Sequence, residues 1–167
     1  WMPPTKKVDG GTVYDVVIIG GGMGGLAACF ALFRVGIRNL RIFDRAEENS
    51  EGPWVTYARM DTLRSPKQLL GPASGLPSLT FRAWYTAQYG EAGWERLDKI
   101  SRTMWMDYLI WYRRTLLIPI ENNVAVDIVS PDRDLLKLVL SGSGADETAI
   151  WARRVVLATG REGLGEP

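Results

Sequence analysis

The sequence predicts an α/β fold: a parallel sheet with a small antiparallel β appendage and a helical, aromatic-rich insertion. Three observations support it. A β-branched run, a glycine turn, an apolar helix and a second strand follow one another within residues 14–44. A buried strand at 154–159 follows a predicted hairpin. Most of the seven Trp and six Tyr lie between Trp54 and Tyr112, which indicates a separate aromatic core or the wall of a pocket.

The N-terminal unit starts with "YDVVII" at 14–19, a β-branched run of strand length. Residues 20–25 include five glycines and predict a tight turn. Residues 26–35 are apolar almost all round, so we expect a buried helix there, with Gly36 at its C-terminal cap. The stretch at 39–44, "NLRIFD", predicts a second strand that ends at Asp44.

The later elements are expected from periodicity and turn signals. A helix is expected at 79–89, and a firmer one follows Ser101, which could cap it, as could Thr103. The strand-length segments are 124–129, 135–140, 148–152 and 154–159. We expect the second and third to form the antiparallel hairpin, and the first and last to join 14–19 and 39–44 in the parallel sheet.

Composition excludes several classes of function. Twenty basic and nineteen acidic side chains give a net charge of +1, so the sequence shows no basic surface suited to nucleic acid. Cys29 is the one cysteine and there is no histidine. An internal disulfide, a Cys/His zinc site and a Ser-His-Asp triad within this chain are therefore excluded, and no metal site is expected.

The ends of the sequence bear on location and completeness. The start has no cationic segment followed by an apolar run and a cleavage site, so we expect a cytoplasmic protein. The first residue is Trp1, and the last residues form a glycine-rich stretch just after a strand. We expect residues 1–167 to be a single domain with an insertion at 52–117, excised from a longer chain whose remainder is its partner.

The uncharged stretch at 16–33 is long enough to cross a membrane, but its glycines favour another interpretation. Gly20, Gly22 and Gly25 fit the pattern G-x-G-x-x-G between a predicted strand and a predicted helix. There the glycines permit a tight turn, close approach of a pyrophosphate and close packing of helix on strand. Asp44 follows at the end of the next strand, where an acid accepts hydrogen bonds from ribose hydroxyls. The sequence therefore predicts a Rossmann-like nucleotide site rather than a membrane span.

Two residues bear on which nucleotide binds. The Asp44 carboxylate would repel a 2′-phosphate, which disfavours NADP at this site. Arg45 could hold such a phosphate, although a solvated side chain at the exit of the strand is the preferred interpretation. FAD or NAD remains.

Four segments resemble the FAD-binding half of flavoprotein monooxygenases of the flavin-containing, Baeyer–Villiger and amine N-hydroxylating types. They occur in the same order as in those families and span nearly the whole chain: "VVIIGGGMGGLA" with "IFDR", "EGPWVTYARMDTLRS", "SRTMWMDYLIWYRRTLLIPIENNVAV" and "RRVVLATG". The chain departs from the pattern at Glu51, which stands where those families have the first glycine of G-G-x-W, and at Asp44, which is usually Glu. No second G-x-G-x-x-G is present.

The resemblance implies roles for individual residues. FAD pyrophosphate would lie at Gly20, Gly22 and Gly25, and its adenosine ribose at Asp44. The other cofactor-binding positions that it implies are Gly52, Trp54, Val126, Ala158, Thr159 and Gly160. For Trp54, core packing is an equally good explanation. The resemblance makes Asp61 and Arg64 the candidate catalytic residues. Asp61 falls where Baeyer–Villiger enzymes keep an acid near the flavin, and Arg64 lies in a stretch similar to one beside the flavin in N-hydroxylases. A structural ion pair or a loop cap is the preferred explanation of both.

Together these observations predict the FAD-binding part of an FAD-dependent oxidoreductase. The resemblance implies a monooxygenase that acts on a small-molecule substrate with NAD(P)H as electron donor. The alternatives are an NAD-binding dehydrogenase domain and a non-catalytic nucleotide-binding module.

Overall fold

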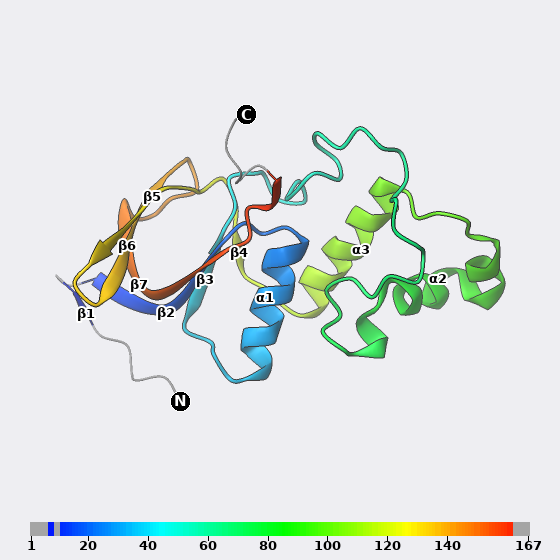
Figure 1. Cartoon of the computed structure of the whole chain (residues 1–167), viewed down its shortest axis with the longest axis horizontal. Helices are drawn as coiled ribbons and strands as arrows, with labels where there is room; N and C mark the ends of the chain where they lie inside the picture. The colour runs from blue at the N-terminus through cyan, green and yellow to red at the C-terminus, as the bar shows by residue number, and fades with distance from the viewer. Residues whose placement is uncertain (1–6, 9–10, 162–167) are drawn as a thin grey trace. The chain divides into compact units, whose positions relative to one another are not determined.

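A computed structural model describes residues 7–8 and 11–161 of the chain. These residues form two compact units (Figure 1). The sheet unit consists of the chain up to Gly52 and from Pro119 onward, and the aromatic unit consists of Pro53–Ile118. Among the described residues, no helix is both long enough and apolar enough to span a membrane.

The sheet unit contains one sheet in the strand order β4-β3-β2-β7-β6-β5, with β1 paired to β2. Its strands are β1 (Lys7–Val8), β2 (Gly11–Ile19), β3 (Leu40–Phe43), β4 (Ile120–Glu121), β5 (Ala125–Asp132), β6 (Leu135–Ser141) and β7 (Ala149–Leu157). Strands β4, β3, β2 and β7 are parallel, and β7, β6 and β5 form an antiparallel meander. The expected α/β class, with a parallel sheet and an antiparallel appendage, is confirmed.

The position of one strand differs from the sequence prediction. Residues 124–129 were expected in the parallel part, but residues 125–129 lie in β5, which among the described strands pairs with β6 alone and in antiparallel direction. The parallel neighbour of β3 is the two-residue strand β4 instead. The segments 148–152 and 154–159 also merge into the single strand β7, so the appendage continues directly into the parallel sheet.

Helix α1 (Met23–Arg34) follows β2 and begins three residues before the expected start. The amide of Leu26 donates to the carbonyl of Gly22, so the glycine turn forms the first turn of the helix. The expected cap is confirmed: Gly36 has φ +83°, and its amide donates to the carbonyl of Phe33. Leu26, Cys29 and Phe30 are buried, but Met23 is 38% and Val35 is 73% exposed. The helix is therefore buried on one side, and not all round as its apolar sequence had predicted.

The core of the sheet unit crosses both parts of the sheet. It contains Val17, Phe43, Val124, Leu138, Leu140, Ile150 and Ala152, all buried. Arg41 of β3 adds a polar link, because its guanidinium pairs with Glu121 of β4 and with Asp146 of the β6–β7 loop. These partners raise the pKa of Arg41 further above its usual value. The hairpin loop is therefore tied to the parallel edge.

The aromatic unit contains the short 3-10 helix η1 (Pro77–Leu79), α2 (Phe81–Arg96) and α3 (Arg102–Thr115). The helix expected at 79–89 corresponds to α2, which is interrupted at Gly90 with φ +69°. Ser101 is confirmed as the cap of α3, since its hydroxyl accepts from the amide of Met104.

The predicted aromatic core is confirmed in this unit. Phe81 is fully buried and its ring lies 5.4–6.4 Å from five other aromatic rings, measured between centroids. Those rings belong to Trp84, Tyr85, Trp94, Trp105 and Tyr108.

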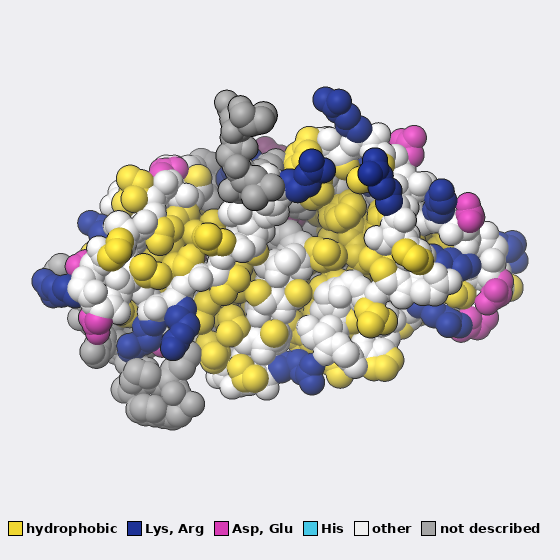
Figure 2. All heavy atoms as spheres, viewed as in Figure 1, with side chains coloured by type: hydrophobic (Ala, Val, Ile, Leu, Met, Phe, Trp, Pro, Cys, Tyr) yellow, Lys and Arg dark blue, Asp and Glu magenta, His cyan; other side chains and the backbone are white. Residues whose placement is uncertain are grey.

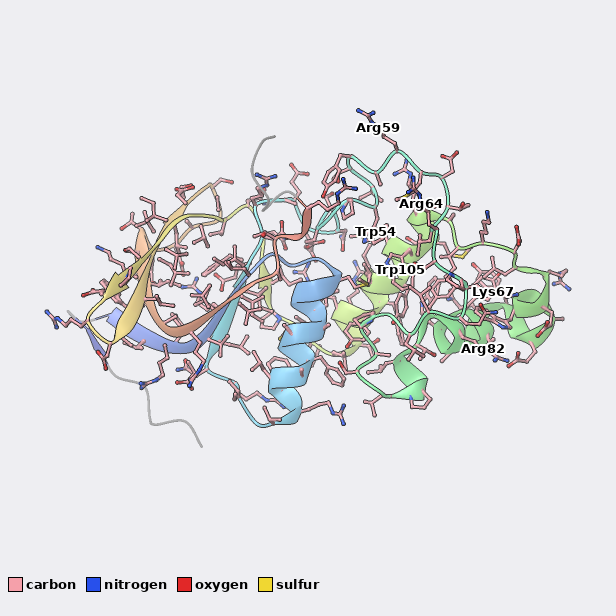
Figure 3. The ribbon with its side chains drawn as sticks, viewed as in Figure 1. Trp54, Arg59, Arg64, Lys67, Arg82 and Trp105 are labelled. Atoms are coloured by element: carbon pink, nitrogen blue, oxygen red, sulfur yellow. The ribbon has the colours of Figure 1, made fainter. Side chains whose placement is uncertain are left out.

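Long side chains hold the irregular segments of the aromatic unit in place. The Tyr108 hydroxyl donates to the carbonyl of Leu79 at 2.6 Å, and the Tyr112 hydroxyl donates to that of Pro72 at 2.7 Å. Lys67 Nζ donates to the carbonyls of Trp94 and Leu97 at the end of α2 (Figure 3). Backbone groups that lack strand or helix partners are thereby satisfied.

Candidate functional site

The glycine turn lies between β2 and α1, where the carboxyl ends of three parallel strands meet. The amide of Gly20 donates to the carbonyl of Phe43 in β3 at 2.8 Å. On the other side, the amide of Ala158, just after β7, donates to the carbonyl of Ile19 at 2.8 Å. Ligands of open α/β sheets bind at this edge.

Two of the three predicted glycines are required by the backbone itself. Gly20 has φ +104°, and a Cβ there would lie 2.5 Å from the carbonyl oxygen of Ala158. A Cβ at Gly25 would overlap the carbonyl oxygen of Gly20. Any side chain at either position would push apart the strand, the turn and the helix.

Gly22 is different, because nothing within the sheet unit requires a glycine there. Its backbone has φ −67° and ψ −169°, which any residue adopts. A Cβ would come no nearer than 3.7 Å to its neighbour, Cα of Gly52, an ordinary van der Waals contact. A glycine in such a place leaves room for a ligand to approach the backbone.

The start of α1 is suited to an anion. Gly22 is its N-cap, no side chain caps the helix, and its first turn contains no acidic residue. The first amides of a helix lack partners within the helix and carry the positive end of its dipole. A phosphate at this point would accept hydrogen bonds from these amides.

Asp44 lies beside the same turn. Its Oδ2 accepts from the amide of Gly21 at 2.7 Å, and its Oδ1 accepts from the amide of Ala46 at 2.8 Å. The two bonds fix the orientation of the carboxylate. A carboxylate offers about four acceptor positions, so further hydrogen bonds from ribose hydroxyls are compatible with this geometry. Arg45, the next residue, is exposed.

The structure brings several of the other predicted residues to this turn. Gly52, with φ +77°, lies next to Gly22, and Ala158 lies against Gly20. Thr159 and Gly160 follow Ala158 and are exposed. Val126 lies in β5 opposite Leu140 and packs against the core of the sheet unit.

Trp54, Asp61 and Arg64 belong to the aromatic unit. The carbonyl of Trp54 accepts from Arg102 Nη1 at 2.6 Å, and its ring meets that of Trp105 edge-on (Figure 3). The carbonyl of Asp61 accepts from the amide of Arg102, whereas the side chains of Asp61 and Arg64 are exposed. These contacts explain Trp54 and the backbone of Asp61 by packing and hydrogen bonding within the unit.

Three residues to which the sequence assigned no role in the site, Gly21, Glu51 and Asn122, also shape it. Gly21 donates to Asp44, and a Cβ on it would lie 2.8 Å from Cγ2 of Ile120, so this glycine is also required. Glu51 is buried, and its Oε1 accepts from Nδ2 of Asn122 at 2.7 Å. The unbroken run of three glycines was a signal for Gly21, but no local pattern links residues 51 and 122.

The residues present fit a dinucleotide such as FAD. The space above Gly22, the uncapped helix start and the oriented Asp44 carboxylate match a pyrophosphate followed by a ribose.

A metal site has no such support: no group of three or more His, Cys, Asp or Glu side chains among the described residues could hold an ion. On the face shown in Figure 2, acidic side chains accompany the basic ones in both units.

Comparisons with known proteins agree with this geometry. A family model described as FAD-NAD(P)-binding matches residues 17–162. An FAD-dependent urate hydroxylase from Xanthomonas campestris pv. campestris is 48% identical over 99% of this chain and 34% of its own length. The chain thus spans about a third of that relative.

Two solved structures also match most of this chain. A flavin-containing monooxygenase from Stenotrophomonas maltophilia is 28% identical with a TM-score of 0.63, and the match covers 87% of this chain and 38% of that one. An ornithine hydroxylase from Pseudomonas aeruginosa has a TM-score of 0.72, covering 89% and 39%. At 15% identity, the second likeness shows the fold alone.

Proposed function

The chain belongs to the FAD-NAD(P)-binding family, and we propose that it is the FAD-binding part of an NAD(P)H-dependent flavin monooxygenase. The observation that carries the proposal is Gly22, which the fold does not require and which lies at the uncapped start of a helix. The relative that is 48% identical supports FAD as the nucleotide and hydroxylation as the reaction.

The residues of the sheet unit have binding roles in this proposal. The first amides of α1 and the backbone at Gly20, Gly22 and Gly25 hold the pyrophosphate. Asp44 accepts hydrogen bonds from the adenosine ribose, and its charge disfavours a 2′-phosphate. The segment after β7, Ala158 to Gly160, closes over the cofactor, and the backbone of Val126 meets the adenine.

FAD, when bound, would supply the redox chemistry of this reaction, in which NAD(P)H provides two electrons, one atom of dioxygen enters the substrate and the other leaves as water. The part played by this chain is to bind and orient the cofactor. In the proposal, Gly52 and Trp54 lie near the flavin end, and Asp61 and Arg64 supply charged groups there. The insertion at 52–117 gives rigid aromatic walls for a small-molecule substrate within a single FAD-binding domain at 1–167.

Urate is the substrate to test first, because the relative from Xanthomonas is named for it. The remainder of the chain would supply the NAD(P)H site, since G-x-G-x-x-G occurs once in these residues. We further propose that the protein works in the cytoplasm.

The experiment uses the full-length protein. We expect the visible absorbance of bound flavin, and oxidation of NAD(P)H that urate accelerates, with one hydroxylated urate formed per NAD(P)H and dioxygen consumed. Bound NAD without flavin would overturn the proposal in favour of a dehydrogenase domain. Nucleotide binding without any NAD(P)H oxidation would overturn it in favour of a non-catalytic module.

A further inference from the structure

We propose that Glu51 and Asn122 form a clamp that positions Asp44 and Gly52 around the glycine turn and so sets the affinity for the adenosine and pyrophosphate part of FAD. This inference rests on the proposed function. It concerns the position at which the chain departs from the G-G-x-W pattern that it resembles.

Glu51 is a carboxylate at a buried position, where Glu is rarely found unless it is paired. It is 4% exposed and is the one charged side chain counted among the buried residues that the structure describes. Burial of a carboxylate is unfavourable unless hydrogen bonds compensate for the lost water. Asn122 provides such a bond, because its Nδ2 donates to Oε1 of Glu51 at 2.7 Å.

Asn122 also holds a second point on the loop that follows β3. The same Nδ2 donates to the carbonyl of Ala46 at 3.1 Å. The amide of Ala46 in turn donates to Oδ1 of Asp44, whose Oδ2 accepts from Gly21. One side chain therefore connects Glu51 with the residues that orient the Asp44 carboxylate.

The other end of the clamp reaches the glycine turn directly. Glu51 is bonded to Gly52, whose Cα would lie 3.7 Å from a Cβ on Gly22. A shift of residues 51–52 would consequently narrow or open the space that Gly22 leaves free. The two ends of the loop, Asp44 and Gly52, are the parts that would meet the ribose and the pyrophosphate.

Asn122 is itself fixed from the opposite side. A Cβ on Gly144, in the β6–β7 loop, would overlap the carbonyl oxygen of Asn122, so this loop packs directly against it. The amide of Asn123 also donates to the carbonyl of Ala46 at 3.1 Å. The donor of the clamp thus comes from a well-supported segment and the acceptor from a loop without regular structure, which makes Asn122 the positioning residue.

The test measures dissociation constants of FAD, ADP and FMN for the full-length protein from which flavin has been removed. Loss of one charge-assisted hydrogen bond corresponds to about tenfold in affinity. Glu51→Ala and Asn122→Ala should each weaken FAD and ADP binding about tenfold while FMN binding stays within about twofold. The double variant should bind FAD no more weakly than Asn122→Ala alone, because Asn122→Ala already removes the hydrogen bond that Glu51 accepts.

Two variants separate positioning from general damage. Glu51→Gln keeps an acceptor oxygen for Asn122 and should retain FAD affinity within about threefold. Glu47→Gln changes an exposed carboxylate of the same loop and should leave all three constants unchanged.

Several outcomes would overturn the clamp. Unchanged ADP affinity in Glu51→Ala and Asn122→Ala, equal losses for ADP and FMN, or additive losses in the double variant would each contradict it. If the unsubstituted protein binds no FAD, the proposed function fails instead, so the two failures are distinguishable.

Discussion

The sheet unit and the aromatic unit achieve order in opposite ways. Around the glycine turn, backbone meets backbone, and Gly20 and Gly25 are needed because any side chain would collide. In the aromatic unit, rings surround Phe81, and the Tyr108 hydroxyl reaches to the carbonyl of Leu79, 29 residues away in the chain. The nucleotide site thus depends on positions that have no side chain, whereas the irregular segments of the aromatic unit are held in place by large side chains.

The largest effect is expected where the aromatic unit loses its central ring. Phe81→Ala should lower the free energy of unfolding by about 3–5 kcal/mol, because the ring is fully buried and the cavity cannot collapse among rigid neighbours. Denaturant titration followed by Trp emission measures the change, since five of the seven Trp lie in this unit. Tyr89→Ala, at an exposed position of the same helix, should cost less than about 1 kcal/mol. Equal losses from both would contradict the central role of Phe81.

The next effect tests the backbone packing of the sheet unit. Gly25→Ala should lower the free energy of unfolding by about 3 kcal/mol, because the new methyl group overlaps the carbonyl oxygen of Gly20. Gly24→Ala is the matched control: its Cβ would be 3.8 Å from that of Ala158, so it should be neutral or stabilising by about 0.5–1 kcal/mol. Thermal unfolding of the two variants side by side checks this, and similar stability in both would refute the steric argument.

Gly22→Ala should separate folding from binding. The fold has room for the methyl group, so the stability lost should not exceed the roughly 1 kcal/mol that alanine costs at an N-cap, whereas affinity for FAD should fall at least tenfold, or about 1.4 kcal/mol. Flavin titration of the full-length protein, beside its unfolding curve, gives both quantities. Unchanged FAD affinity would show that nothing approaches Gly22, and the cofactor site would have to be sought elsewhere.

The smallest effect concerns Cys29. Burial raises the pKa of its thiol from 9.0 to about 12. Below pH 9 both the folded and the unfolded state keep the proton, but above it the unfolded state loses the proton first. The stability that this thiol contributes should therefore fall between pH 9 and 12, by about 1.4 kcal/mol at pH 10.

Alkylation of Cys29 measures this behaviour and also reports on the sheet unit alone. At pH 8 the folded protein should resist labelling and the unfolded protein should react. Cys29→Ala should lose this part of the pH dependence. Rapid labelling of the folded protein at pH 8 would contradict the burial of Cys29.

The same contrast explains what the sequence could and could not predict. The turn at 20–25, its helix, Asp44 and the hairpin are encoded by neighbouring residues, and all were predicted close to where they lie. The direction of β5 was not predicted correctly, because the alternating pattern at 124–129 is the same in a parallel and in an antiparallel strand. Strand β4 has two residues, too few to leave any periodic pattern.

Long-range polar contacts were also out of reach. Glu51 and Asn122 are 71 residues apart, and Tyr112 and Pro72 are 40 apart. Such pairs depend on how the chain returns after an irregular segment, and the types of the two residues do not specify each other. The sequence therefore predicted the glycines of the turn but not the contact between Glu51 and Asn122 beside it.

The chain leaves the sheet unit and returns to it beside the same glycine turn. Gly52, before the chain leaves, neighbours Gly22, and Ile120, after it returns, would touch a methyl group on Gly21. The intervening 66 residues are thus an excursion that departs from and rejoins the same turn. During evolution, this region could be exchanged or resized while the strand register and the first amides of α1 stayed as they are, so one glycine turn can be inherited by enzymes that differ in the molecules they accept.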